Sequence, residues 1–146
     1  MTCVAALDPG RSKCGVVLVD IDAAVVRNGV ILRSNTVLET LNTWHRHDRF
    51  ELILIGDGTG SRNWNDCLQA LAPVQMVNER GTTLRARARF WQLWPATGWR
   101  ALLPEGLRVP PGDLDAVAAL VMVEDHFGIT CEWPITAPLF RTAPSP

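Results

Sequence analysis

The sequence predicts one α/β domain built on a mixed sheet, and two observations support that prediction. The first third of the chain holds short apolar segments separated by turn residues, a pattern typical of strands joined by hairpins. The middle third alternates apolar runs with segments of helical periodicity, which is typical of a parallel βαβ unit. Because a chain of 146 residues fits a single core, we expect residues 1–146 to form one domain.

Three strands are predicted first, and their short connections favour antiparallel pairing. Val4–Leu7 and Val16–Val19 are apolar and flank a turn that contains a Pro-Gly pair. Val25–Arg33 is the third predicted strand, and the Asn-Gly pair within it indicates either a tight hairpin or a β-bulge.

Helices and strands alternate in the rest of the chain. Leu52–Ile55 is apolar at every position, as expected of an interior strand covered on both faces, and Val74–Val77 is a second, shorter strand. Apolar residues at helical spacing predict four helices around them: Thr36–His47, residues 64–71, Thr82–Trp94 and Leu114–Phe127. The tail, residues 128–146, is rich in proline, which disfavours another regular helix.

Composition argues against several classes of protein. No apolar run approaches the roughly 20 residues that span a bilayer, and the N-terminus lacks the pattern of a signal peptide, so we expect a cytoplasmic protein. The four cysteines are scattered without a Cys-x-x-Cys pair, which predicts reduced thiols rather than a zinc site or disulfides.

The net charge of −1 conceals a basic stretch in the second half of the chain. Its arginines share the segment with a single acid, Glu105, and they are Arg80, Arg85, Arg87, Arg89, Arg100 and Arg108. Arginine binds phosphate in a bidentate manner, which suits a nucleic-acid surface, although a codon bias toward arginine explains the excess equally well. Trp91, Trp94 and Trp99 lie in the same region, either as platforms for unpaired bases or as core residues.

Three acidic residues lie at element boundaries. Asp8 follows the first predicted strand, Glu79 follows the strand ending at residue 77, and Asp115 lies in the first turn of the last predicted helix. Because parallel strands present their carboxyl ends at one edge of a sheet, Asp8 and Glu79 should share that edge. Clustered carboxylates bind Mg²⁺ or Mn²⁺, and two such ions about 4 Å apart promote phosphodiester cleavage. A turn-capping role explains Asp8 alone equally well.

Two further acids lie close to these positions. Asp113 competes with Asp115, because aspartate is favoured both at the N-cap and in the first turn of a helix, and we assign the cap to Asp113 and the metal to Asp115. Asp57 lies in the glycine-rich loop 56–61 and is a weaker candidate, since organising that turn is the simpler role.

Three segments resemble, in order, the acidic motifs of the YqgF (RuvX-like) family: VAALDPGRSKCGVVLVD, VNERGTTLRAR and DLDAVAAL. The resemblance runs from about Val4 to about Phe127. It implies an RNase H-like fold whose mixed five-stranded sheet has three antiparallel strands followed by parallel ones. It also implies metal-dependent cleavage of branched DNA, as in Holliday junction resolvases, or of structured RNA such as precursor ribosomal RNA.

Carried over residue by residue, the resemblance assigns catalysis and the binding of two Mg²⁺ or Mn²⁺ ions to Asp8, Glu79 and Asp115. The side chains expected to contact nucleic acid are Lys13, Arg80, Arg85 and Arg89. A homodimer would suit symmetric cutting of a junction.

The chain departs from the family pattern in three places. Asn78 stands where an aspartate is usual, the loop 56–59 replaces a proline-bearing one, and Arg100–Pro111 resembles only a divergent branch associated with cyanobacteria. These departures motivate the alternative of a catalytically inactive RNase H-like module that binds nucleic acid. An actin-like ATP-binding domain is a third hypothesis, although such clefts usually need two domains.

Overall fold

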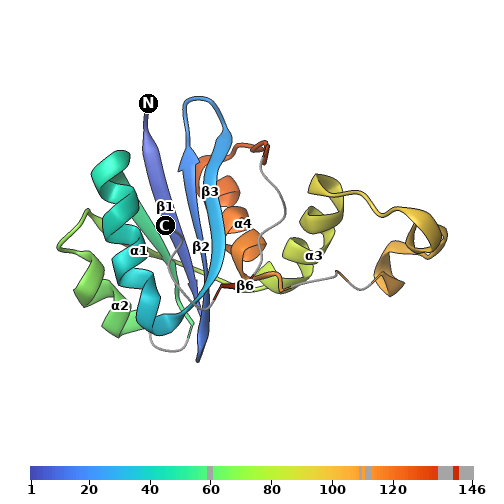
Figure 1. The fold of residues 1–146 in the computed structure, drawn as a ribbon, viewed down its shortest axis with the longest axis horizontal. Helices are drawn as coiled ribbons and strands as arrows, with labels where there is room; N and C mark the ends of the chain where they lie inside the picture. Colours follow the sequence, from blue (N-terminus) through green and yellow to red (C-terminus); the bar gives the residue numbers. More distant parts are fainter. Residues whose placement is uncertain (59–60, 109, 111–112, 135–139, 142–146) are drawn as a thin grey trace.

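The computed structural model describes residues 1–58, 61–108, 110, 113–134 and 140–141. One mixed sheet, with strand order β5-β4-β1-β2-β3-β6, carries helices on both faces (Figure 1). The strands are β1 (Cys3–Pro9), β2 (Lys13–Asp20), β3 (Val25–Arg33), β4 (Phe50–Gly56), β5 (Val74–Val77) and β6 (Phe140–Arg141). The helices are α1 (Ser34–His47), α2 (Ser61–Leu68), α3 (Thr82–Leu93) and α4 (Asp115–Phe127), with 3-10 turns η1 (Gly98–Leu102) and η2 (Glu105–Leu107).

The strand pairing confirms the predicted mixed sheet. β1, β2 and β3 pair antiparallel, whereas β4 pairs parallel to β1 and β5 pairs parallel to β4. All five predicted strands are present. The proline-rich tail adds a two-residue sixth strand, β6, which lies parallel to β3 and which the sequence did not predict.

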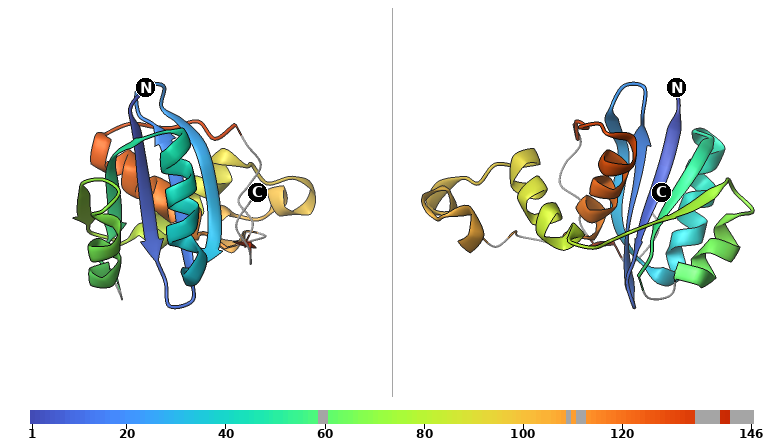
Figure 2. Two further views of the ribbon diagram at one scale, coloured as in Figure 1. Left: turned by 60° about the vertical axis from the view of Figure 1, so that its left-hand side comes forward. Right: turned by 180° about the vertical axis from the view of Figure 1, so that it is seen from behind.

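Two apolar layers cover the two faces of the sheet. Alternating residues of β1 point to opposite faces, so that Val4 and Ala6 pack toward α4 while Ala5 and Leu7 pack toward α1 and α2. Eight consecutive residues of α4, Ala116–Val123, are buried because the helix lies between the sheet and α3 (Figure 2). This position places the N-terminus of α4 at the edge where β1 ends.

The Asn-Gly pair of β3 belongs to a bulge rather than to a hairpin. Leu18 pairs with Asn28 and Val19 pairs with Val26, which leaves residue 27 as the extra residue. A Cβ at the following glycine, Gly29, would overlap the ring of Trp133. The described part of the tail therefore returns to cover β3, with Trp133 buried against it.

The apolar face of α3 differs in part from the stripe of Leu84, Ala88 and Trp91 that helical spacing predicts. Trp91 is buried and Leu84 is exposed, whereas Ala86 and Phe90 are buried as well. The reason is that α3 packs on α4 rather than on the sheet, so its contact face is set by that helix.

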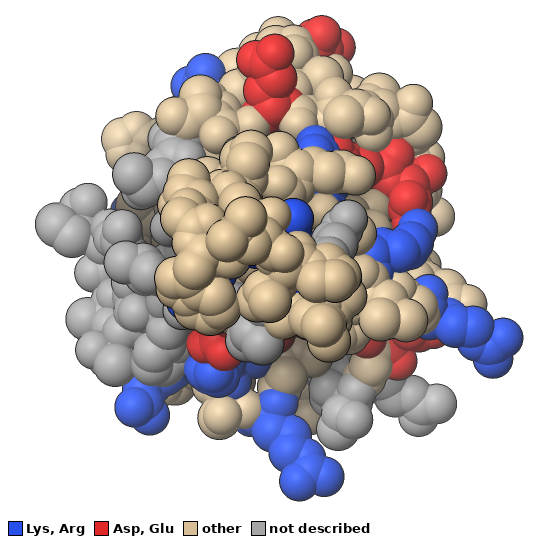
Figure 3. Space-filling model, turned by 90° about the vertical axis from the view of Figure 1, so that its right-hand side faces the viewer, with Lys and Arg blue, Asp and Glu red and all other residues tan. Residues whose placement is uncertain are grey.

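Residues 94–108, which we call the arm, connect α3 toward α4. The arm contains η1 and η2 and projects away from the sheet beside α3 (Figure 2, right). Figure 3 looks onto this side of the molecule, where mostly uncharged surface fills the centre of the view and both basic and acidic side chains lie around it. Among the described helices, none combines the length and apolar character needed to cross a membrane. All four cysteines are free thiols.

Candidate active site

Asp8 lies within β1 rather than after it, because the strand continues to Pro9. Its partner across the hairpin is Gly15 of β2. A Cβ at Gly15 would overlap the backbone of Asp115 and Ala116, so the glycine lets the first turn of α4 rest directly on the hairpin. This close approach brings Asp115 to the same edge of the sheet as Asp8.

Glu79 reaches that edge from the segment after β5. Its carboxylate lies over the end of β4, where a Cβ at Gly56 would overlap it and a Cβ at Gly58 would lie 2.6 Å from Oε2. The backbone amide of Glu79 donates a hydrogen bond to Asp57 Oδ1 at 3.2 Å. Gly56, the last residue of β4, and Gly58 thus leave room for the Glu79 carboxylate, and Asp57 holds the backbone amide of Glu79.

Two of the three acids, Asp8 and Asp115, have raised proton affinities, and burial is the largest cause at both. Burial raises the pKa of Asp8 to about 8, with further contributions from a hydrogen bond to Glu79, the charge of Glu79 and the charge of Asp115. Burial and the charge of Asp113 raise the pKa of Asp115, and the charge of Lys13 partly offsets this. Among the residues that the structure describes, no ion pair joins a cationic side chain to Asp8.

The chemistry of this edge fits a divalent cation. Glu79 Oε1 is buried and has no hydrogen-bond partner, which is costly unless another group satisfies it. Carboxylate oxygens are the ligands that Mg²⁺ and Mn²⁺ prefer. Within the described ranges, however, no three His, Cys, Asp or Glu side chains are arranged to hold an ion as they stand. Asp8 and Glu79 lie within hydrogen-bonding distance of each other at this edge.

Asp113 does not cap α4, and the prediction that it does is wrong. The N-cap residue is Leu114, which makes no side-chain capping bond. Asp113 Oδ2 instead accepts a hydrogen bond from Lys13 Nζ at 2.8 Å. The reason is that the long side chain of Lys13 reaches across from the β1–β2 hairpin. Its charge therefore lies beside the end of the sheet that carries Asp8, Glu79 and Asp115, which we call the acidic edge.

The predicted phosphate-binding arginines have different surroundings. Arg80 is exposed next to Glu79, and its backbone amide donates to Asn78 Oδ1 at 2.7 Å, which gives the Asn78 amide a role in the turn. Arg85 is half-exposed and pairs with Asp125 of α4. These two side chains lie at the surface of the molecule, where a polyanion can reach them.

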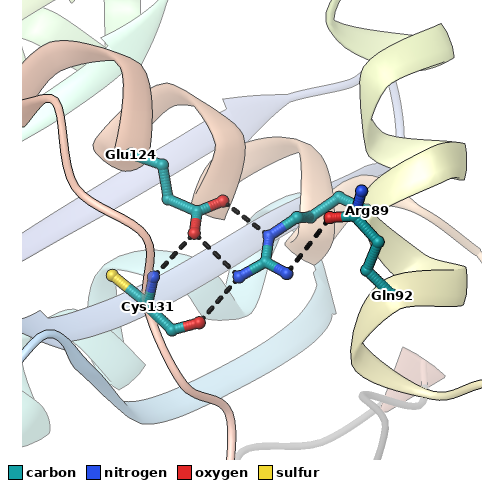
Figure 4. Close-up of polar contacts among 4 residues, drawn as sticks. All are labelled: Arg89, Gln92, Glu124 and Cys131. Atoms are coloured by element: carbon teal, nitrogen blue, oxygen red, sulfur yellow. Dashed lines mark hydrogen bonds and ion pairs between the residues drawn. The ribbon is translucent and has the colours of Figure 1, made fainter.

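Arg89 is instead a structural residue (Figure 4). Its guanidinium donates to both carboxylate oxygens of Glu124 at 2.9 Å and to the carbonyl of Cys131 at 2.7 Å. Only 14% of the Arg89 side chain and 11% of the Glu124 side chain are exposed. Arg89 therefore joins α3, α4 and the tail, and these contacts already occupy the guanidinium that the sequence predicts to bind nucleic acid.

Two positions that shape the site were not singled out for that role from the sequence. Gly15 admits α4, and Asp57 holds the amide of Glu79. A glycine inside an otherwise apolar strand indicates that another backbone approaches closely. The position of Gly15 in its strand could therefore have predicted the contact with α4. The hydrogen bond of Asp57 spans 22 residues and leaves no such pattern.

Comparison with known proteins relates this chain to others by fold alone. No protein-family model matches it, and no curated protein matches it in sequence. The structure of T. thermophilus RuvC in complex with a Holliday junction substrate is similar, with a TM-score of 0.53 and 13% sequence identity over 84% of this chain and 90% of that one. This similarity confirms the RNase H-like fold. Membership of the YqgF family stays a prediction.

A second similar structure is a variant of the nuclease domain of the large terminase subunit gp2 of bacterial virus Sf6, with manganese and beta-thujaplicinol. Its TM-score is 0.39, with 18% identity over 53% of this chain and 38% of that one. A match of this extent adds nothing to the assignment of the fold.

Proposed function

We propose that the protein is a divalent-metal-dependent nuclease whose metal ligands are Asp8, Glu79 and Asp115. The observation that carries the proposal is their convergence from β1, the segment after β5 and the start of α4. At this edge burial and like charges raise the pKa of Asp8 to about 8. Acids whose pKa values are shifted this way, in a fold shared with RuvC, are typical of a functional site rather than of a structural one.

The residues around the edge have distinct tasks in this proposal. When bound, two Mg²⁺ or Mn²⁺ ions supply an activated water and stabilise the leaving oxygen of the phosphodiester. Asp8 offers carboxylate oxygens from a rigid strand, and the loop after β4 keeps the carboxylate of Glu79 over the sheet edge. Lys13 and Arg80 lie beside the acids and would hold the phosphate backbone.

For the substrate we propose branched DNA or a structured RNA such as precursor ribosomal RNA. Two observations support this class: the three motifs that resemble the YqgF family, and the similarity in fold to RuvC, which was solved with a Holliday junction substrate. A homodimer would present two acidic edges to the two strands of a junction that must be cut.

Cleavage by the purified chain tests the proposal. We would incubate it with Mn²⁺ or Mg²⁺ and labelled four-way junctions, gapped duplexes or a structured RNA, beside the variant Asp8→Asn. We expect metal-dependent cleavage that Asp8→Asn lowers by at least about 100-fold, the loss typical of removing a group that stabilises the transition state. Glu51→Gln is the matched control, because this exposed acid lies at the opposite end of β4 and its loss should change nothing. Cleavage by Asp8→Asn at the rate of the unsubstituted protein would refute the metal-site proposal.

A nucleic-acid-binding module without catalysis is the second candidate. The observation in its favour is that the acids of the described chain are not arranged as a ready set of three ligands. Isothermal titration with Mn²⁺ separates the two candidates. The nuclease should bind Mn²⁺ and lose that binding in Asp8→Asn, whereas the inactive module should bind junctions but not the ion.

A further inference from the structure

The arm, residues 94–108, exposes large apolar side chains that the fold does not use. The exposed fractions are 67% for Trp99, 86% for Leu102 and 66% for Leu107. Trp91 and Trp94, by contrast, pack with Phe90 and belong to the core layer around α4. Several exposed apolar groups on one short projecting segment are typical of a binding surface.

The arm has a fixed shape because arginine side chains satisfy its backbone. The guanidinium of Arg108 donates to the carbonyls of residues 100, 101 and 103 at 2.9 to 3.3 Å. The guanidinium of Arg87, on α3, donates to the carbonyls of Gly106 and Arg108 at 2.7 to 3.2 Å. The apolar side chains are therefore presented by a preorganised segment, which lowers the entropy lost on binding.

The arm and the helix before it carry excess positive charge. Residues 80–108 hold six arginines and one acid, Glu105. Ion pairs with Asp125 and Glu124 of α4 neutralise Arg85 and Arg89. Arg87 and Arg108 donate to carbonyl groups, which have no formal charge, so their positive charges remain. A surface of this sign suits a polyanion and disfavours a second copy of the same surface.

We propose that the arm binds unpaired bases of the nucleic-acid substrate, with Trp99 stacking on a base and Leu102 and Leu107 against its neighbours. This inference rests on the proposed function and adds to it the element that would select the substrate. In a continuous duplex the faces of the bases are covered by stacking, whereas at gaps, branch points and loops they are accessible. The guanidinium of Arg100 lies 5.5 Å from the centroid of the Trp99 ring, where it adds a cation–π contact and a charge for the phosphates.

The arm is within reach of a strand bound at the acidic edge. Arg108 and Asp115 are seven residues apart in the sequence, so their Cα atoms lie at most about 25 Å apart. At about 3.4 Å per nucleotide along a strand, this limit corresponds to roughly seven nucleotides. A substrate cut at the acids can therefore reach Arg108 at the end of the arm. The guanidinium of Arg108 donates to the carbonyl of Arg100, the neighbour of Trp99, so the ring of Trp99 lies about one arginine side chain beyond that point.

Binding measured without cleavage tests the inference. We would use fluorescence anisotropy with the full chain and Ca²⁺ in place of Mg²⁺, on a four-way junction, a gapped duplex and a continuous duplex. We expect Trp99→Ala to weaken binding to the junction and the gapped duplex by about tenfold and to leave the continuous duplex within twofold, because one stacked base is lost. Trp99→Phe should restore most of the affinity. Leu38→Ala is the matched control, since it removes an exposed apolar side chain from α1, on the other face of the sheet.

Three results would overturn the inference. One is unchanged affinity of Trp99→Ala for every substrate. Another is an equal loss on the junction and on the continuous duplex, which would indicate a backbone or folding effect. The third is a change in sedimentation behaviour without a change in nucleic-acid affinity, which would make the arm a protein interface. Trp99→Ala could weaken binding to the junction and the gapped duplex alone while the protein cleaves none of the substrates. That result would support base binding by the arm and refute the proposal that the protein is a nuclease.

Discussion

The two ends of α4 hold carboxyl groups in opposite electrostatic states. At the C-terminal end, Glu124 is buried against Arg89, and both of its oxygens accept hydrogen bonds. At the N-terminal end, Asp115 lies at an edge with Asp8 and Glu79, where burial and, to a smaller extent, the hydrogen bond and like charges of these neighbours raise the pKa of Asp8 to about 8. One helix thus carries a neutralised pair and an unneutralised cluster, separated by eight buried residues.

The difference distinguishes a structural site from a functional one. A buried carboxylate with a bidentate arginine is satisfied, so nothing further needs to bind there. A buried cluster of acids costs free energy of folding, and that cost is usually found where a ligand or cation relieves it. Perturbing each end separately tests this interpretation, because the two ends should respond in opposite ways.

The largest effect is expected at the neutralised end. Arg89→Ala should lower the free energy of unfolding by about 3 to 5 kcal/mol, because it leaves Glu124 buried without its partner. Equilibrium denaturation with urea measures this loss. Arg85→Ala is the matched control, since it breaks the exposed pair with Asp125 and should cost less than about 1 kcal/mol. Equal losses in the two variants would contradict a structural role that depends on burial.

An opposite response is expected at the acidic edge, where stability should fall as pH rises. Asp8 has a pKa of about 8 in the folded protein and 3.8 as its ordinary value, so between these pH values the folded state holds a proton that the unfolded state has lost. The metal-free protein should therefore lose up to about 1.4 kcal/mol of stability per pH unit within this window. Urea denaturation in EDTA at pH 5, 6 and 7 measures the slope.

Two further measurements connect this slope to the site. Asp8→Asn should flatten the pH dependence, because the amide does not titrate in this range. Mn²⁺ should stabilise the protein more at pH 8 than at pH 5, since a cation competes with the proton for the same oxygens. A slope that is the same in Asp8→Asn would assign the pH dependence to other groups.

The sequence was sufficient to predict the sheet and the edge where the acids meet, because both depend on local patterns. Apolar runs located the first five strands, and the positions of Asp8, Glu79 and Asp115 near the ends of elements followed from the predicted strands and helices, although Asp8 lies within β1 and not after it. The order of the motifs added the RNase H-like fold, which the similarity to RuvC confirms.

Long-range partners could not be predicted in the same way. Arg89 was expected to contact nucleic acid because it belongs to a basic stretch, and the sequence did not reveal its partner, Glu124, which lies 35 residues further along the chain. Lys13 and Asp113 are 100 residues apart, so the helix start looked like a capping site. β6 is only two residues long, too short to produce a periodic pattern. In each case the contact forms between elements that are far apart in the sequence and meet only through packing. Local sequence patterns carry no information about such contacts.

The smallest expected effect concerns Asp57, which is next to the acidic edge but need not bind the ion. If its task is to hold the backbone amide of Glu79, Asp57→Asn should keep nearly full cleavage, because the amide oxygen still accepts that hydrogen bond. Asp57→Ala should lower kcat by about tenfold and destabilise the protein by about 1 kcal/mol, the usual contribution of one hydrogen bond. Cleavage assays and urea denaturation on both variants measure these effects.

The pair of variants also separates positioning from metal binding at Asp57. A ligand would lose its charge in Asp57→Asn, so both variants would then need a higher Mn²⁺ concentration for half-maximal cleavage. A positioning residue would leave the metal requirement of Asp57→Asn unchanged and shift only that of Asp57→Ala, in which Glu79 is less firmly held. Because Asp57 is exposed whereas Glu79 Oε1 is buried and lacks a partner, we expect the second pattern. The acidic edge would then consist of three charged groups that bind and one that holds a neighbour in place.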